Sequence, residues 1–301
     1  MRREGKRVVA LGFFDGVHRG HAALLDRAKA QAQALGALPT VLTFDIHPGQ
    51  FISGERVPLI NSLRDRVALI ERLYGIKDVV VIPFDEALRR TAWSAFLESL
   101  GRELQAVHLI CGHNFHFGYQ GDGNVLKLQA ACGKLGMGCD VVPEVSVEDV
   151  PVSSTYIRKL LTEGEMERAG RFLGHPHVLT ETVGHGRKLG RTIGVPTINL
   201  TIPPEVLIPA RGVYATRVFL PEEESGYAAV TNIGTRSTVE TEQGLTVETY
   251  LLDFAGDLYG RRVRVEFYRY LRAERKFSDL QALGLQIQRD AAAARAYFEA
   301  Y

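Results

Sequence analysis

The chain has 301 residues, 46% of them hydrophobic, which is enough for two domains with buried cores. Its 36 basic and 35 acidic side chains leave a net charge of +1. The chain therefore has no overall positive field that would hold a nucleic acid, and a nucleic acid is not expected as a partner. The three cysteines form no CxxC pair and predict reduced thiols in a cytoplasmic protein. The first apolar run is interrupted at Asp15, and no stretch approaches the roughly 18 apolar residues of a membrane span, so neither a secretion signal nor a membrane segment is expected.

The first half of the chain alternates β-branched runs with helical patterns. Helices are predicted from about Leu24 to Gly36, a C′ glycine, and from Ser62, an N-cap, to Gly75. Strands are predicted at residues 7–11, 39–44, 78–82, 106–110 and 139–142. This alternation predicts an α/β domain with a Rossmann-like parallel sheet and helices on both of its faces.

From about residue 177 the pattern changes to strands with a period of two, as at residues 263–267, where apolar and charged residues alternate. This region predicts an antiparallel β domain, so the domains are expected at residues 1–174 and 175–301. After Phe277 a closing helix is predicted, with Ser278 and Gln281 as a capping box and an apolar stripe that packs on the β domain.

The stretch GFFDGVHRGH, residues 12–21, follows the first predicted strand and opens the first helix. His18 and His21 are three residues apart, which places both rings on one helix face. The free backbone N–H groups and the dipole of a helix N-terminus favour an anion, and imidazole N–H donors can stabilise charge on phosphate oxygens. From these residues alone, phosphate binding, metal binding and a plain surface role all remain open.

This stretch resembles the signature of the nucleotidylyltransferase superfamily, whose HxGH element is residues 18–21, and its FFDGVH form is closest to the bacterial bifunctional riboflavin kinase/FAD synthetase family. GHNFHFG at residues 112–118 and SSTYIR at residues 153–158 resemble two further motifs of that family. The resemblance implies catalytic roles for His18, His21 and Arg158. It implies nucleotide binding by Gly12, Phe13, Phe14, Asp15, Gly20, Gly112, Asn114, Ser153, Ser154 and Thr155.

A fourth match, TFDIHP at residues 43–48, falls at the carboxyl end of the second predicted strand, where ligands bind in open α/β sheets. Families of this kind usually have proline where Ile46 stands. Within SSTYIR, Ser153 or Ser154 would serve as a helix cap whether or not it also contacts a triphosphate.

The β region opens with GHGRKLGRTIGVPTIN, residues 184–199, a basic glycine-rich stretch that suits either a polyphosphate cover or a solvated turn. Its end, GVPTIN, resembles the PTAN element of riboflavin kinases. The resemblance implies that Thr197 and Asn199 help to hold Mg²⁺, which prefers oxygen ligands, and that Lys188, Gly190 and Gly194 contact nucleotide. Val195 and Ile198 replace the family's usual aromatic and alanine residues.

Residues 247–254 predict a strand in which Glu248 shares one face with Tyr250 and Leu252. A primary alcohol that attacks a γ-phosphate must lose its proton, so this reaction needs a base. The resemblance assigns that role to Glu248. Matches also occur at TNIG, residues 231–234, and across residues 271–290. Ser237, which follows the TNIG match, stands where the family commonly has proline. The last match implies flavin binding by Arg275 and Phe277, with Asn114 contacting flavin phosphate in the other domain.

The resemblance as a whole implies an N-terminal nucleotidylyltransferase domain and a C-terminal riboflavin kinase-like β-barrel with a closing helix. It implies two reactions with Mg²⁺ and two ATP molecules: riboflavin is phosphorylated to FMN, and FMN is adenylylated to FAD with release of pyrophosphate. The adenylyl transfer needs no general base, because the attacking phosphate is already an anion. The alternatives are another nucleotidylyltransferase, a chain that retains one activity, or a flavin-binding regulator descended from the enzyme.

Overall fold

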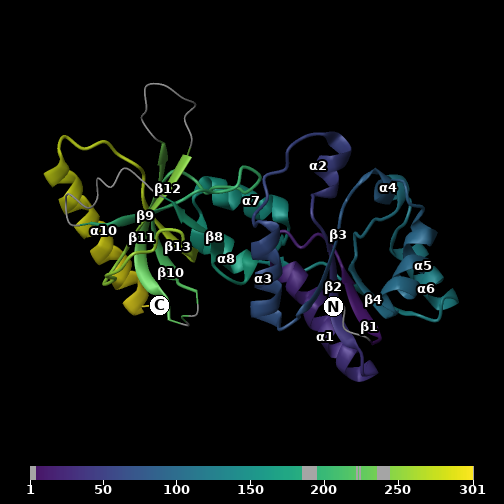
Figure 1. Ribbon diagram of the computed structural model, residues 1–301. Coiled ribbons are helices and arrows are strands. Elements are labelled where there is room, and N and C mark those ends of the chain that lie inside the picture. The colour runs from purple at the N-terminus through teal and green to yellow at the C-terminus, as the bar shows by residue number, and fades with distance from the viewer. Residues whose placement is uncertain (1–4, 185–194, 222, 224, 236–244, 301) are drawn as a thin grey trace. The chain divides into compact units, whose positions relative to one another are not determined.

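The computed structural model describes residues 5–184, 195–221, 223, 225–235 and 245–300, which fold into two compact units (Figure 1). The first unit comprises residues 1–59 and 66–153, and the second comprises residues 60–65 and 154–301. Each unit has its own sheet. Among the described residues, no helix has the length and apolar character needed to cross a membrane.

The first unit contains a five-stranded, fully parallel sheet in the order β3-β2-β1-β4-β5. Its strands are β1 (Arg7–Leu11), β2 (Leu38–Phe44), β3 (Asp78–Ile82), β4 (Ala106–Gly112) and β5 (Gly138–Val142), with a small β6 (Ser146–Val147) and β7 (Val150–Pro151) hairpin. Its helices are α1 (Arg19–Leu35), α2 (Pro48–Ser53), α3 (Leu63–Tyr74, which begins in the segment of the second unit), α4 (Glu86–Arg89), α5 (Trp93–Leu104) and α6 (Val125–Lys134), with a 3₁₀ turn at Tyr119–Gly121.

Both faces of this sheet are covered, as the sequence predicts. Val8 and Val9 on β1 point to opposite faces, and both are fully buried. One face packs against Phe96 of α5 and Leu128 of α6, whereas α1 contacts β1, β2 and β4. The predicted end of the first helix is also confirmed, because Gly36 is its left-handed C-cap with φ 59°.

The second unit is a closed antiparallel barrel in the order β10-β11-β12-β9-β8-β13. Its strands are β8 (His177–Gly184), β9 (Thr197–Leu200), β10 (Gly212–Phe219), β11 (Tyr227–Thr235), β12 (Leu245–Leu251) and β13 (Arg262–Arg272). Its helices are α7 (Ser154–Glu163), α8 (Met166–Leu173) and α10 (Leu280–Ala300). The predicted fold class, a parallel α/β domain with an antiparallel barrel and a closing helix, is therefore confirmed.

Helix α10 packs on the outside of the barrel, where Ala291 and Ala294 join a cluster with Val213 and Val230. Its predicted capping box at Ser278 is wrong. The helix begins one residue later, because the Asp279 carboxylate accepts a hydrogen bond from the N–H of Ala282 (2.8 Å). Its charge also suits a helix N-terminus better than a hydroxyl does.

The two compact units divide between Ser153 and Ser154, so α7 and α8 pack with the barrel. Residues 60–65 do the same: the Asn61 amide donates to the carbonyl of Val178 (3.1 Å), and Asp65 accepts from the N–H of Thr180 (3.2 Å). The predicted N-cap at Ser62 is confirmed, since its hydroxyl accepts from the N–H of Asp65 (3.1 Å). The domain boundary at residues 174 and 175 stays a prediction.

A line of three threonine hydroxyls stabilises the barrel. The hydroxyls of Thr216 and Thr231 lie 2.8 Å apart, those of Thr231 and Thr249 lie 2.9 Å apart, and all three residues are fully buried. Thr231 is the middle member, so its removal leaves two buried hydroxyls without their partner.

We expect Thr231→Val to lower the free energy of opening of the barrel by about 1–3 kcal/mol, because the unpaired hydroxyls of Thr216 and Thr249 stay out of water. Hydrogen exchange of amides in β11 and β12, read by mass spectrometry, measures this change. Thr182→Val, on an exposed position of β8, is the matched control and should change the value by less than about 0.5 kcal/mol. Equal effects of the two variants would contradict the assignment.

Candidate functional sites

The GFFDGVHRGH stretch forms a strained turn between β1 and α1. Phe14, Gly16 and Val17 have φ values of 60°, 82° and 42°, in the left-handed region that non-glycine residues rarely adopt. Phe14, Asp15 and Val17 are buried, and the Thr43 hydroxyl donates to the carbonyl of Phe13 (2.9 Å), which fixes the turn against β2. The chain therefore reaches the first turn of α1 along one defined path.

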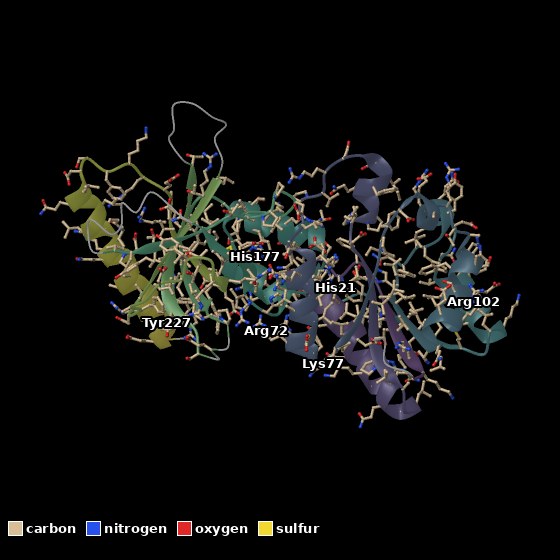
Figure 2. All side chains as sticks on the ribbon, viewed as in Figure 1. His21, Arg72, Lys77, Arg102, His177 and Tyr227 are labelled. Atoms are coloured by element: carbon tan, nitrogen blue, oxygen red, sulfur yellow. The ribbon has the colours of Figure 1, made fainter. Side chains whose placement is uncertain are left out.

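This path places His18 and His21 together, as predicted. His18 is the N-cap of α1, where its Nδ1 accepts a hydrogen bond from the backbone N–H of His21 (3.3 Å). The two rings stack with centroids 3.6 Å apart, and His21, labelled in Figure 2, lies on α1. A side chain at Gly20 would have its Cβ 3.1 Å from the His18 ring, so glycine there makes room for the imidazole.

The electrostatics of the pair keep His21 neutral. Burial, the neighbouring His18 and the charge of Arg66, in that order, lower the pKa of His21 well below its ordinary value. The buried Nδ1 of His21 has no hydrogen-bond partner among the described residues. Because His18 uses Nδ1 as an acceptor, its Nε2 carries the proton as a donor when the ring is neutral. The pair thus combines ring nitrogens with the N-terminus of a helix, an arrangement suited to an anion.

A cavity of about 270 Å³ opens at the carboxyl ends of β1 and β2. Its walls are mostly apolar and aromatic, and they include Gly12, the first residue of the signature stretch. Its other wall residues include several from the strand ends and the segments that follow them, such as Phe44, Pro48, Ile52, Phe84, Phe115 and Phe117. Such a cavity suits a flat, largely apolar ring system.

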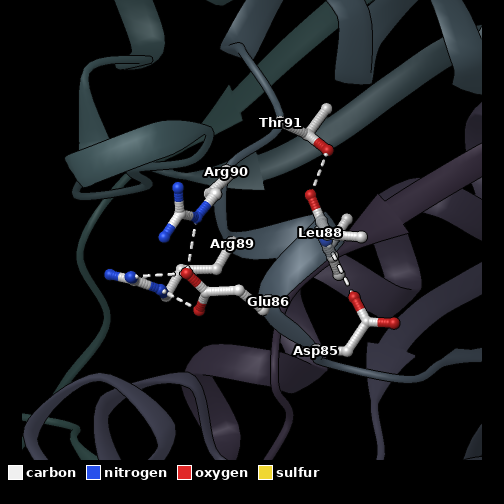
Figure 3. Close-up of polar contacts among 7 residues, drawn as sticks. Asp85, Glu86, Leu88, Arg89, Arg90 and Thr91 are labelled. Atoms are coloured by element: carbon white, nitrogen blue, oxygen red, sulfur yellow. Dashed lines mark hydrogen bonds and ion pairs between the residues drawn. The ribbon is translucent and has the colours of Figure 1, made fainter.

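One cation, Arg89 of α4, also lines this cavity, and Figure 3 shows how it is held. The Glu86 carboxylate accepts two hydrogen bonds from Arg89 (2.7 and 2.8 Å) and one from Arg90 (2.6 Å). Those hydrogen bonds lower the pKa of Glu86 to about 2. Asp85 caps the helix by accepting from the N–H of Leu88 (2.8 Å), so the short helix presents Arg89 in one place.

The GHNFHFG stretch contributes a second wall. Asn114 is exposed in the tight turn after β4, next to the end of β1, and its Oδ1 lies 3.6 Å from where a Cβ on Gly112 would be. The rings of Phe115 and Phe117 stack with centroids 5.3 Å apart. Gly118 has φ +75°, and a Cβ there would be 2.6 Å from the Trp93 backbone, so only glycine fits.

The SSTYIR and TFDIHP stretches are the two remaining predicted motifs of the nucleotide site. Ser153 belongs to the first unit, whereas Ser154, Thr155 and Arg158 belong to α7 of the second, so their approach to the two histidines stays a prediction. In the TFDIHP stretch, the N–H of Ile46 donates to Asp45 (2.8 Å), a hydrogen bond that proline could not make.

In the barrel unit, the strand register gathers the predicted kinase residues. Glu248 on β12 is paired directly with Asn199 on β9 and, on its other side, with Asn232 on β11. Residues paired across antiparallel strands have Cβ atoms about 5 Å apart on the same face. Thr197, two residues before Asn199, shares that face and is paired with Tyr250. The predicted base and both predicted metal ligands therefore lie in one patch.

A second cavity, of about 220 Å³, lies beside this patch and is lined by Thr197, Ile198, Phe254, Asp257 and Tyr259, among others. Val195 and Ile198, the two departures from the PTAN pattern, are buried, so they change packing and leave the face of Thr197 and Asn199 intact. Lys188, Gly190, Gly194 and Ser237 lie outside the described residues.

The donors of this patch fit Mg²⁺. Thr197 and Asn199 offer a hydroxyl and an amide oxygen, both partly exposed and on the same face as the Glu248 carboxylate. Mg²⁺ takes oxygen ligands, and commonly one or two come from protein while water and substrate phosphates complete the shell. Within the described ranges, no group of three or more His, Cys, Asp or Glu side chains could hold a metal ion, so an all-protein cage is not offered there.

The predicted flavin residues Arg275 and Phe277 contact each other, with the Arg275 guanidinium 4.9 Å from the ring centroid. Arg275 also donates to Gln286 on α10, whose amide donates to Asp290 (2.7 Å). Asp290 is buried and accepts three hydrogen bonds from Arg272 at the end of β13 (2.7–3.1 Å). This network ties the loop that carries Arg275 and Phe277 to α10 and to the barrel.

Sequence reasoning missed Asn232 and Arg66. Asn232 lies within the TNIG match, but its place opposite Glu248 follows only from the pairing of β11 with β12. Arg66 is a fully buried cation on α3, on the same stripe as the buried Leu69 and Ile70. A charged residue at a core position of a helical pattern was the available signal.

Comparisons with known proteins match two family models to two successive parts of the chain. Residues 1–156 match a family model described as FAD synthetase, and residues 173–298 match one described as riboflavin kinase. The bifunctional riboflavin kinase/FMN adenylyltransferase of Listeria monocytogenes is 35% identical over 97% of this chain and 92% of its own length. That of Pseudomonas fluorescens is 37% identical over 96% and 92%.

A crystal structure described as a macrolide-efflux protein from Streptococcus pneumoniae superposes with a TM-score of 0.85 at 27% identity, covering 97% of this chain and 95% of that one. The fold is thus shared along almost the whole length. Since both family models match in order, and relatives above 30% identity extend over nearly the entire chain, the chain belongs to the bifunctional riboflavin kinase/FMN adenylyltransferase family.

Proposed function

We propose that the two units carry out successive steps of flavin cofactor synthesis at the residues described above. The barrel unit phosphorylates riboflavin with ATP to FMN, and the parallel-sheet unit transfers AMP from a second ATP to FMN, forming FAD and pyrophosphate. The observation that carries the proposal is the strand register that sets Glu248 directly opposite Asn199, beside Thr197 and a cavity.

In the kinase step, Glu248 accepts the proton of the riboflavin primary hydroxyl while the hydroxyl oxygen attacks the γ-phosphorus of ATP; the bond from that phosphorus to the β-phosphate oxygen breaks, and ADP leaves. Thr197 and Asn199 would hold Mg²⁺, which when bound neutralises phosphate charge and orients the transferred group. The adjacent cavity, with Ile198 and Phe254 in its wall, accepts the apolar part of the nucleotide. Arg275 and Phe277, fixed by the α10 network, contact the flavin.

In the adenylyl transfer, a phosphate oxygen of FMN attacks the α-phosphorus of ATP, and the bond to the pyrophosphate leaving group breaks. The nucleophile is already an anion, so the chain supplies position and charge compensation only. His18, His21 and the N-terminus of α1 stabilise the reacting phosphate, with Arg158 on the triphosphate and Asn114 on the flavin phosphate. The apolar cavity between the ends of β1 and β2 takes the flavin ring.

With riboflavin, ATP and Mg²⁺, we expect FMN to rise first and then to decline as FAD forms, because one product is the other's substrate. Chromatography of the three flavins over time measures this order, and omission of Mg²⁺ should abolish both steps. FMN that accumulates without FAD would show that only the kinase is retained. Flavin binding without turnover would support a regulatory protein instead.

His21→Ala should lower the rate of FAD formation from FMN by a factor on the order of 10²–10³, because one preorganised donor to the reacting phosphate is lost. FMN formation from riboflavin by the same preparation should be unchanged, which provides an internal control for folding. Loss of both activities would contradict separate sites.

Glu248→Gln should do the reverse. We expect FMN formation to fall by a factor on the order of 10²–10⁴, since the amide cannot accept the hydroxyl proton, while FAD formation from supplied FMN continues. Glu181→Gln removes a carboxylate from β8 of the same barrel and is the matched control. Initial rates with riboflavin and with FMN compare the two variants, and a similar loss in both would overturn the role of Glu248.

A further inference from the structure

Arg66 on α3 is a cation that the mechanism above does not use. Its side chain is one of the largest that are fully buried in the described part of the chain. Its Nη2 donates to the carbonyl oxygen of Phe44, the last residue of β2 (2.5 Å), and its guanidinium carbon lies 4.0 Å from the centroid of the Phe13 ring. Phe13 follows β1 by two residues, so Arg66 joins the ends of two neighbouring strands where the strained turn begins.

The remaining donors of Arg66 are unfilled. Its Nε and Nη1 are buried and have no hydrogen-bond partner among the residues that the structure describes. Burial lowers the pKa of Arg66 to about 10, against the opposing fields of Asp15 in the turn and Asp45 after β2, so the group is charged at neutral pH. A buried cation with unfilled donors reduces stability, and an apolar side chain of similar size is often as stable or more so.

A structural role alone therefore does not account for this charge. The neighbouring buried positions of α3, Leu69 and Ile70, are apolar. The reaction proposed for this unit brings a polyphosphate and a phosphate monoester to the same end of the sheet, and a nearby positive charge compensates theirs. The unfilled donors reduce the stability of the free protein, and such a loss is typical of a residue that is kept for function and not for folding.

Arg66 also acts on the histidine pair. The titratable and charged groups that lower the pKa of His21 are His18, at the cap of the same helix, and Arg66 from α3. His18 caps α1 through its Nδ1 and its ring stacks on that of His21, so Arg66 places its charge near a pair of rings that the start of α1 holds together.

We propose that Arg66 is a positioning residue for adenylyl transfer: it joins Phe13 to the end of β2 and sets a positive charge near His21, where the polyphosphate binds. The inference rests on the proposed function of this unit. Phe13 and His21 then touch or approach substrate, whereas Arg66 acts through them.

The test compares Arg66→Met, Arg66→Lys and the wild-type chain in FAD formation from FMN and ATP. For Arg66→Met we expect kcat to fall on the order of 100-fold, with the KM values of ATP and FMN within about threefold. Arg66→Lys keeps the charge, so its kcat should be about tenfold higher than that of Arg66→Met. The acidic limb of kcat/KM, which reports the free enzyme, should move to higher pH in Arg66→Met because His21 is easier to protonate, and stay near wild type in Arg66→Lys.

Arg7→Met is the matched control. Arg7 is also a buried arginine, at the amino end of β1, and it forms an ion pair with Asp78 (2.9 Å). Its loss leaves Asp78 without this partner and should lower the unfolding temperature while leaving the pH profile unchanged. Arg66→Met should lose less in unfolding temperature than Arg7→Met, because the methionine fills the buried site, although Asp15 and Asp45 lose a nearby opposite charge.

Several outcomes would overturn the inference. A loss in Arg66→Met no larger than in Arg7→Met would reduce Arg66 to a folding role. A raised KM for ATP with unchanged kcat would make it a direct phosphate ligand, and an Arg66→Lys variant that folds but is as inactive as Arg66→Met would exclude the charge. If the wild-type chain forms no FAD, the proposed function itself fails; if it does and Arg66→Met matches it, only this inference fails.

Discussion

The strained turn between β1 and α1 is the constraint on which the first unit's site depends. Phe14 and Val17 adopt left-handed backbone conformations that cost of order 1–3 kcal/mol each. Both side chains are fully buried, and burying such a side chain contributes about 1.5–3 kcal/mol, which offsets the strain. Because the turn cannot relax without exposing them, His18 reaches the N-cap of α1 and His21 stacks against it.

In the second unit, closure of the barrel is the constraint that fixes the positions of the site residues. Every strand has two neighbours, so no strand can slide without breaking two ladders, and a slip of one residue would move a side chain to the other face. Glu248, Asn199 and Asn232 thus share one face by virtue of the register alone. The buried threonine line through Thr231 on the opposite face adds polar contacts that only this register satisfies.

Much of the fold follows from local signals. Alternating β-branched runs and helical stripes predict the parallel sheet, and Gly36 and Ser62 mark helix ends correctly. The start of α10 did not follow, because Ser278 and Asp279 are adjacent candidates whose choice depends on where the helix docks. The motif residues were assigned by resemblance, but the pairing of Asn232 with Glu248 needs the strand register, and the role of Arg66 needs three chain segments in contact.

The two proposed reactions make different demands on the chain. A phosphate nucleophile is already charged, so the adenylyl site benefits from positive charge, and Arg66 and the N-terminus of α1 supply it. The kinase reaction starts from a neutral hydroxyl and therefore also needs a group that accepts a proton, beside the Mg²⁺ that Thr197 and Asn199 would hold. The strand register provides that group in Glu248, directly opposite Asn199. Separate compact units let one site surround an anionic nucleophile with positive charge while the other keeps a carboxylate next to a neutral one.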